Sequence, residues 1–122
     1  MARAAATPPP RIRRVAILAD AHKSGVVELA AELTSWLADR RVHTQVLHDP
    51  RAWEREAAPR ADLVVVLGGD GSILSAARAY AARPVPIVGV NFGRVGFLAS
   101  VEASQWREAL EDVLAGRARV EE

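Results

Sequence analysis

The sequence predicts one α/β domain built on a doubly wound parallel sheet, and three observations lead to that prediction. The run Val64 to Val66 is apolar and β-branched without polar alternation, which is typical of a strand buried on both faces. A glycine-rich turn, Gly68-Gly69-Asp70-Gly71, and then a helical pattern follow it directly. Apolar segments alternate with amphipathic ones along the whole chain, which favours parallel strands joined by right-handed crossovers. We therefore expect the strand around Val65 to lie at the centre of the sheet.

The composition limits the class of protein. With 122 residues, of which 50% are hydrophobic and 25% charged, the chain resembles one soluble globular domain. A net charge of +1 gives no basis for a nucleic-acid partner, and no apolar run approaches the roughly 18 residues of a membrane span. The lack of cysteine excludes disulfides and thiolate metal sites. It is consistent with a reducing compartment, so we expect a cytoplasmic protein without a membrane partner.

The first half of the chain predicts a tail, two strands and a helix. Residues 1–11 contain three consecutive prolines and predict a disordered tail, followed by a domain that spans residues 12–122. Apolar residues at three- and four-residue steps predict the helix. The elements expected here are a strand at Val15–Ala19, a polar loop at Asp20–Gly25, a helix from Val26 to about Arg40, and a strand containing Val42, Thr44 and Val46.

The second half continues the alternation. Asp49-Pro50 predicts a turn into a weakly helical piece, Trp53 to Ala58, which Pro59 ends. The remaining expected elements are the central strand from Asp62, a helix from Ile73 to Ala82 with Ser72 as its N-cap, a strand from Pro84 to Val90, and a final helix within Val101–Ala115 that Ser104 caps and Gly116 ends.

Two glycine-punctuated loops are candidates for a binding site. Gly68 to Ser72 follows the central strand, and Asn91 to Leu98 follows the next strand. Because the carboxyl ends of parallel strands meet at one edge of a sheet, we expect these loops to lie together. Glycines let the first loop adopt unusual dihedral angles and approach a ligand closely, and a helix N-terminus favours an anion. The pattern matches neither the P-loop nor the dinucleotide-binding fingerprint.

Asp70 is the most informative residue of the first loop. A carboxylate among phosphate-binding amides repels a phosphate unless it accepts a proton from an attacking hydroxyl or holds a magnesium ion. The alternative is a helix cap that bonds the first amides. Arg94 is either a solvated residue or a phosphate clamp, and Phe97 is either a core residue or a contact to a base. His22 and Lys23 lie on the same predicted edge, where a polar turn explains them equally well.

The segment from Asp62 to Ala99 resembles the N-terminal domain of NAD kinases. Gly68-Gly69-Asp70-Gly71-Ser72 is similar to their GGDG(T/S) loop, which phosphofructokinases and diacylglycerol and sphingosine kinases share. Gly89-Val90-Asn91-Phe92-Gly93-Arg94-Val95-Gly96-Phe97-Leu98 is similar to a second and more specific NAD kinase signature. The resemblance implies a Rossmann-like nucleotide-binding domain.

This resemblance also implies an activity and a set of site residues. NAD kinases transfer a phosphate from ATP, or from polyphosphate in some members, to the adenosine-ribose 2′-hydroxyl of NAD, with a divalent metal such as Mg²⁺. They form dimers and tetramers, so the resemblance implies a homo-oligomer. The implied roles are catalysis for Asp70, contacts to NAD for Asp70, Gly71, Leu74 and Phe97, and contacts to phosphate for Gly68, Gly69, Ser72 and Arg94, with no residue assigned as a metal ligand.

The chain departs from the family pattern in two places. Ser75 stands where many bacterial members have arginine or histidine. The family's second, β-rich domain has no counterpart after Glu122, so we expect the chain to be an N-terminal half without activity of its own. Two other functions stay open: a lipid or sugar kinase with the same loop, and a non-catalytic nucleotide-binding module.

Overall fold

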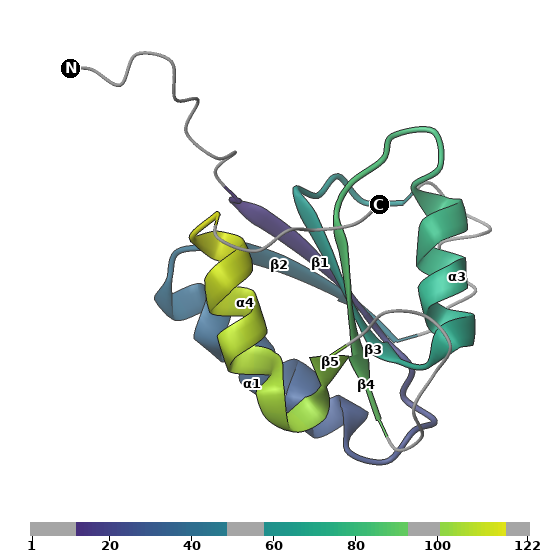
Figure 1. The fold of residues 1–122 in the computed structure, drawn as a ribbon, viewed down its shortest axis with the longest axis horizontal. Coiled ribbons are helices and arrows are strands. Elements are labelled where there is room, and N and C mark those ends of the chain that lie inside the picture. Colours follow the sequence, from purple (N-terminus) through teal and green to yellow (C-terminus); the bar gives the residue numbers. More distant parts are fainter. Residues whose placement is uncertain (1–11, 49–57, 93–100, 117–122) are drawn as a thin grey trace.

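The computed structural model describes residues 12–48, 58–92 and 101–116, which form a parallel sheet with helices on both faces (Figure 1). The sheet order is β2-β1-β3-β4-β5, and each neighbouring pair is parallel. The strands are β1 (Arg14–Ala19), β2 (His43–Leu47), β3 (Leu63–Gly68), β4 (Ile87–Asn91) and β5 (Val101–Glu102). The helices are α1 (Val26–Asp39), α3 (Asp70–Ala79) and α4 (Trp106–Leu114), with a short 3-10 turn, η1 (Ala103–Gln105), before α4. The predicted fold class is confirmed.

β3 is the central strand, as its apolar run predicts. All six of its residues are buried. Leu63, Val65 and Leu67 pack into the core beneath α1 and α4, whereas Val64 and Val66 pack toward α3. Burying each of these side chains on either face contributes about 1.5–3 kcal/mol. The sheet is therefore held by two cores, one on each face, and both β1 and β3 contribute side chains to each of them.

α1 forms where the predicted apolar stripe lies, and its last turn closes tightly. The buried residues of the helix are Val26, Leu29, Ala30, Leu33 and Leu37. At its end, the Arg41 amide donates to the Ala38 carbonyl and the Val42 amide donates to the Leu37 carbonyl, each at 2.9 Å. This pair of bonds is a Schellman motif, and it requires a left-handed residue, which is Arg41 with φ 63°.

Two predicted caps are wrong. α3 begins at Asp70, three residues before the predicted start, and its N-cap is Gly69, so Ser72 lies inside the first turn. Ser104 lies in η1, the N-cap of α4 is Gln105, and no side chain caps that helix. In both places the chain enters helical geometry before the polar residue is reached, and the side chain is no longer next to the first free amides. The predicted Gly116 stop is confirmed, because Gly116 has φ 76° and its amide donates to Val113.

Some expectations fall outside the described residues. These are the tail over residues 1–11 and most of the weakly helical piece at residues 53–58. β5 was not expected from the sequence and adds a fifth strand at the β4 edge. Among the described helices, none has both the length and the apolar character to cross a membrane.

Candidate functional site

The candidate site lies where the sheet changes its winding direction. The chain leaves β1 through α1 to β2 on one side, and leaves β3 through α3 to β4 on the other. α1 and α3 cover opposite faces of the sheet (Figure 1). In such sheets a crevice opens at the carboxyl ends of the two strands that diverge, and ligands bind there. We call the residues at and just after the ends of β1, β3 and β4 (Asp20–Gly25, Gly68–Ser72, Asn91 and Phe92) the carboxyl edge.

The three segments of the carboxyl edge contact one another. The Asp20 amide donates to the Leu67 carbonyl at 3.0 Å, and the Phe92 amide donates to the Gly68 carbonyl at 3.4 Å. Gly25, with φ 86°, faces the Phe92 ring, since a Cβ atom placed there would lie 3.5 Å from the ring. The expectation that the glycine-rich loop and the start of the second loop lie together is therefore confirmed.

The glycines of the first loop serve close approach rather than unusual dihedral angles. Gly69 has φ −130°, an ordinary extended value. A Cβ atom at Gly68 would lie 2.9 Å from the Ser72 hydroxyl oxygen, so the strand end and the helix start touch. A Cβ atom at Gly71 would have no neighbour within 4 Å. Gly68 is thus required for packing within the protein, while Gly71 leaves open space in front of the helix.

A lysine lies next to Gly69, the N-cap of α3. The Lys23 side chain approaches Gly69, with its Nζ atom 3.8 Å from the position that a Cβ atom would occupy. Its loop is fixed by the Lys23 amide, which donates to the Asp20 carbonyl at 3.0 Å, and by the His22 amide, which donates to Oδ1 of Asp20 at 3.1 Å. The N-terminus of α3 and an ammonium group therefore converge on one place, which suits an anion.

Comparison with known proteins identifies the family. The family model described as the ATP-NAD kinase N-terminal domain matches residues 48–118, more than half of the chain. The chain belongs to this family.

Curated relatives agree with the assignment. The chain is 39% identical to a protein named NAD kinase from Heliobacterium modesticaldum over 116 residues, covering 88% of this chain and 41% of that protein. It is 43% identical to the NAD kinase of Nitratidesulfovibrio vulgaris over 112 residues, which cover 90% of this chain and 38% of the relative. The NAD kinase of Trichlorobacter lovleyi is 39% identical over 91% of this chain and 42% of its own length. The chain thus spans about two fifths of the length of these relatives.

Asp70 lies at the N-terminus of α3, on the carboxyl edge of this ATP-NAD kinase N-terminal domain. It is the first residue of α3 and is half-buried, with the N-cap Gly69 before it and the exposed Gly71 after it. A carboxylate in the first helical turn is favoured by the helix dipole. Asp70 does not occupy the N-cap position, which belongs to Gly69, so its carboxylate lies within the first turn of the helix.

The carboxyl edge contains a carboxylate of the kind that can bind Mg²⁺ together with phosphate groups. Mg²⁺ in phosphoryl-transfer sites is usually bound by one or two carboxylates together with the phosphates of the substrate. Asp70 offers one carboxylate beside the anion-favouring end of α3. Within the described part of the chain, no group of three or more His, Asp or Glu residues is arranged to hold a metal by itself.

The other predicted site residues differ in their surroundings. Leu74 is 45% exposed on α3, which leaves its side chain available to a ligand. Ser72 is only 6% exposed and packs against Gly68. Arg94 and Phe97 lie outside the described residues. The roles assigned to these residues stay predictions.

Lys23 was placed on this edge from the sequence, but it was not assigned as a site residue because a polar turn explains it equally well. Nothing local distinguishes it from the polar residues of an ordinary turn. The sequence signal was its position directly after a buried strand next to the central one. Its closeness to Gly69 results from the pairing of β1 with β3, in which Ala19 lies beside Leu67.

Proposed function

We propose that this chain forms the phosphate-binding edge and supplies the catalytic carboxylate of an NAD kinase. The reaction transfers the γ-phosphate of ATP, or a phosphate of polyphosphate, to the 2′-hydroxyl of the adenosine ribose of NAD and yields NADP. The observation that carries the proposal is the position of Asp70, at the start of α3 on the carboxyl edge. Membership of the ATP-NAD kinase N-terminal domain family supports it.

The residues of the edge suit an in-line phosphoryl transfer. The ribose 2′-oxygen attacks the γ-phosphorus, the bond from that phosphorus to the β,γ-bridging oxygen breaks, and ADP leaves. In our proposal Asp70 orients the hydroxyl and accepts its proton. The first amides of α3 and the ammonium of Lys23 stabilise negative charge on the phosphoryl oxygens. A bound Mg²⁺ would neutralise charge on the phosphates of the donor and would be held mainly by those phosphates.

The substrate contacts follow the same arrangement. Gly71 is exposed and has free space around it, so NAD can approach the backbone closely there. Leu74, one turn further along α3, presents an apolar side chain to the same substrate. Gly68, Gly69 and Ser72 belong to the phosphate side of the loop, and we propose that Arg94 and Phe97 complete the phosphate and adenine contacts.

We propose that further residues are needed for turnover, because the chain spans about two fifths of its relatives' length. Phosphoryl transfer depends on positioning, and an incomplete substrate site loses it. We therefore expect NAD binding and turnover from the longest polypeptide that the gene encodes and no turnover from these 122 residues. That polypeptide is proposed to act in the cytoplasm as a homo-oligomer, a dimer or tetramer.

The test is the variant Asp70→Asn in that longest polypeptide, assayed for NADP formation from NAD and Mg-ATP. The amide keeps the shape of the side chain and removes its basicity, so we expect kcat to fall by about 10²–10⁴-fold. Asp39→Asn, the same change at the exposed end of α1, is the matched control and should keep full activity. Undiminished turnover of Asp70→Asn, with an unchanged unfolding transition, would remove Asp70 from the mechanism.

A further inference from the structure

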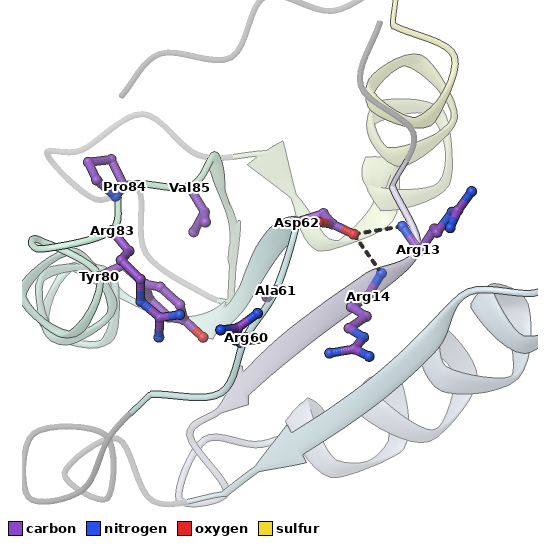
Figure 2. Close-up of a pocket in the computed structure, with 9 residues that line it drawn as sticks. All are labelled: Arg13, Arg14, Arg60, Ala61, Asp62, Tyr80, Arg83, Pro84 and Val85. Atoms are coloured by element: carbon purple, nitrogen blue, oxygen red, sulfur yellow. Dashed lines mark hydrogen bonds between the residues drawn. The ribbon is translucent and has the colours of Figure 1, made fainter.

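A second concave site lies at the amino ends of the strands, opposite the carboxyl ends where Asp70 lies. A pocket of about 560 Å³ is formed by the residues that precede β1, β3 and β4, together with the end of α3 (Figure 2). We call it the arginine pocket; its lining residues are Arg13, Arg14, Arg60, Ala61, Asp62, Tyr80, Arg83, Pro84 and Val85. Its volume is within the range of pockets that bind small molecules.

The lining is strongly positive. It contains four arginines and one carboxylate, that of Asp62. The Asp62 carboxylate has a structural task, because its Oδ2 atom accepts the backbone amides of Arg13 and Arg14 at 2.9 and 3.0 Å. That contact joins the start of β1 to the start of β3 and uses no guanidinium group (Figure 2). Among the lining residues that the structure describes, no carboxylate is therefore paired with a guanidinium group.

The guanidinium groups have spare donors. Within residues 12–48, 58–92 and 101–116, those of Arg14 and Arg60 make no hydrogen bond or ion pair. Arg83 makes a single long contact, from Nη2 to the Ala58 carbonyl at 3.4 Å. Figure 2 shows Arg60 and Arg83 on the side of Tyr80, with Arg14 across from them, while the Arg13 side chain points away from the other three. Three arginines thus remain available to a ligand.

The end of α3 does not cancel this charge. A helix carboxyl end carries a partial negative charge that disfavours anions. Here the carbonyls of Arg78 and Tyr80 already accept the amides of Ala81 and Arg83, at 3.3 and 3.1 Å. The Tyr80 hydroxyl donates to the Pro59 carbonyl at 2.5 Å and is likewise occupied. The guanidinium groups are the main unsatisfied polar groups in the described wall of the pocket.

We propose that the arginine pocket binds a small anion with two or more phosphate groups, separately from the substrates at the carboxyl edge. Guanidinium groups bind phosphate oxygens with paired, charge-assisted hydrogen bonds, and three of them around one pocket favour a ligand with several phosphate oxygens. The apolar surfaces of Pro84 and Val85 leave room for a small organic part of the ligand. The net charge of +1 does not favour a long polyanion such as nucleic acid, since the positive charge is local.

The test uses inorganic pyrophosphate without magnesium, added to the 122-residue chain, with binding followed by calorimetry and by backbone amide NMR shifts. We expect the largest shifts at Ala61, Asp62, Arg83 and Val85. The double variant Arg60→Gln/Arg83→Gln should weaken binding at least tenfold. Two variants serve as controls: Lys23→Gln removes a charge at the carboxyl edge, and Arg107→Gln removes one on the distant helix α4. Both should leave the affinity for pyrophosphate at the arginine pocket, followed by the shifts of Ala61 and Val85, within about twofold of the unchanged protein.

Three outcomes would overturn the proposal. The first is that the shifts are confined to Gly69–Ser72 and abolished by Lys23→Gln, which would assign pyrophosphate to the carboxyl edge. The second is an equal loss of affinity in Arg107→Gln and the double variant, which would indicate binding to overall charge alone. The third is binding of an oligoglutamate peptide with no binding of pyrophosphate, which would make the pocket a docking site for acidic protein segments. None of these outcomes depends on whether the carboxyl edge phosphorylates NAD.

Discussion

Gly68 and Gly71 lie three residues apart in one loop, but a methyl group would meet different surroundings at each. At Gly68 it would lie 2.9 Å from the Ser72 hydroxyl oxygen and 3.2 Å from the Ser72 Cβ. We expect Gly68→Ala to lower the free energy of unfolding by about 1–3 kcal/mol, because an overpacked junction must shift. Gly71→Ala should be neutral or gain up to about 1 kcal/mol, because alanine favours a helix and the space is open.

Stability and function should therefore separate at these two glycines. Denaturant unfolding of both variants measures stability, and the KM for NAD in the longest polypeptide measures substrate contact. We expect Gly71→Ala to raise that KM although it does not destabilise the protein. A Gly71→Ala variant with unchanged KM would contradict the proposed contact between NAD and the backbone at Gly71.

Tyr80 gives a prediction about pH. Burial raises its pKa from 10.0 to about 12, although the nearby Arg83 acts in the opposite direction. The folded state thus holds the proton more tightly than the unfolded state does, so this contribution to stability is complete below pH 10 and is lost between pH 10 and 12.

The measurement is direct because Tyr80 is the one tyrosine in the chain. Tyrosinate absorbance of the native protein should titrate near pH 12, and that of the denatured protein near pH 10. In Tyr80→Phe the loss of stability over this interval should be smaller than in the unchanged protein. Native absorbance that titrates near pH 10 would show that the ring is not desolvated.

At the scale of the elements, the end of α1 has a conformational strain that one substitution can remove. Arg41 has φ 63° in a Schellman motif, the position where glycine is usual. We expect Arg41→Gly to raise the free energy of unfolding by about 0.5–1 kcal/mol. A side chain in the left-handed region costs roughly 1–2 kcal/mol, and glycine removes that cost. Part of the gain is offset because glycine also increases the conformational entropy of the unfolded chain. Equilibrium denaturation measures the difference.

The matched control is Ala38→Gly, one residue before the end of the same helix. That position is helical and exposed, so glycine should lower stability by about 1 kcal/mol. The two glycine substitutions should therefore have opposite signs. A loss of stability in Arg41→Gly comparable to that in Ala38→Gly would mean that the Arg41 side chain stabilises the turn more than its backbone strain costs.

The packing of helices on the sheet was predictable where it depends on local periodicity. The stripe from Val26 to Leu37 and the run from Leu63 to Leu67 indicate a helix on a sheet and a central strand, and both are confirmed. The start of α3 was not predictable from propensity, because Ser72 is a good N-cap residue by itself. Its hydroxyl lies instead against Gly68, a contact that only the strand-to-helix junction creates.

At the scale of the whole molecule, the sequence indicated which loops form the site but not all of its members. The strand order brings the loop after β1 to the glycine-rich loop, and Lys23 with it, although the two are more than forty residues apart. β5 has only two residues, too few for any periodic pattern. The arginine pocket was not predicted, since Arg14, Arg60 and Arg83 meet only when the strand starts are aligned.

We propose that the carboxyl edge phosphorylates the adenosine-ribose 2′-hydroxyl of NAD, and analysis of the reaction products is the decisive test. The longest polypeptide that the gene encodes is incubated with Mg-ATP and with NAD, a diacylglycerol or a sugar as acceptor, and the phosphorylated position is determined by NMR. For the longest polypeptide we predict that NAD is the one acceptor of the three that is phosphorylated, with NADP and ADP formed in equal amounts. The 122-residue chain should form no NADP under the same conditions. A polypeptide that binds Mg-ATP and phosphorylates a lipid or a sugar but never NAD would contradict the account.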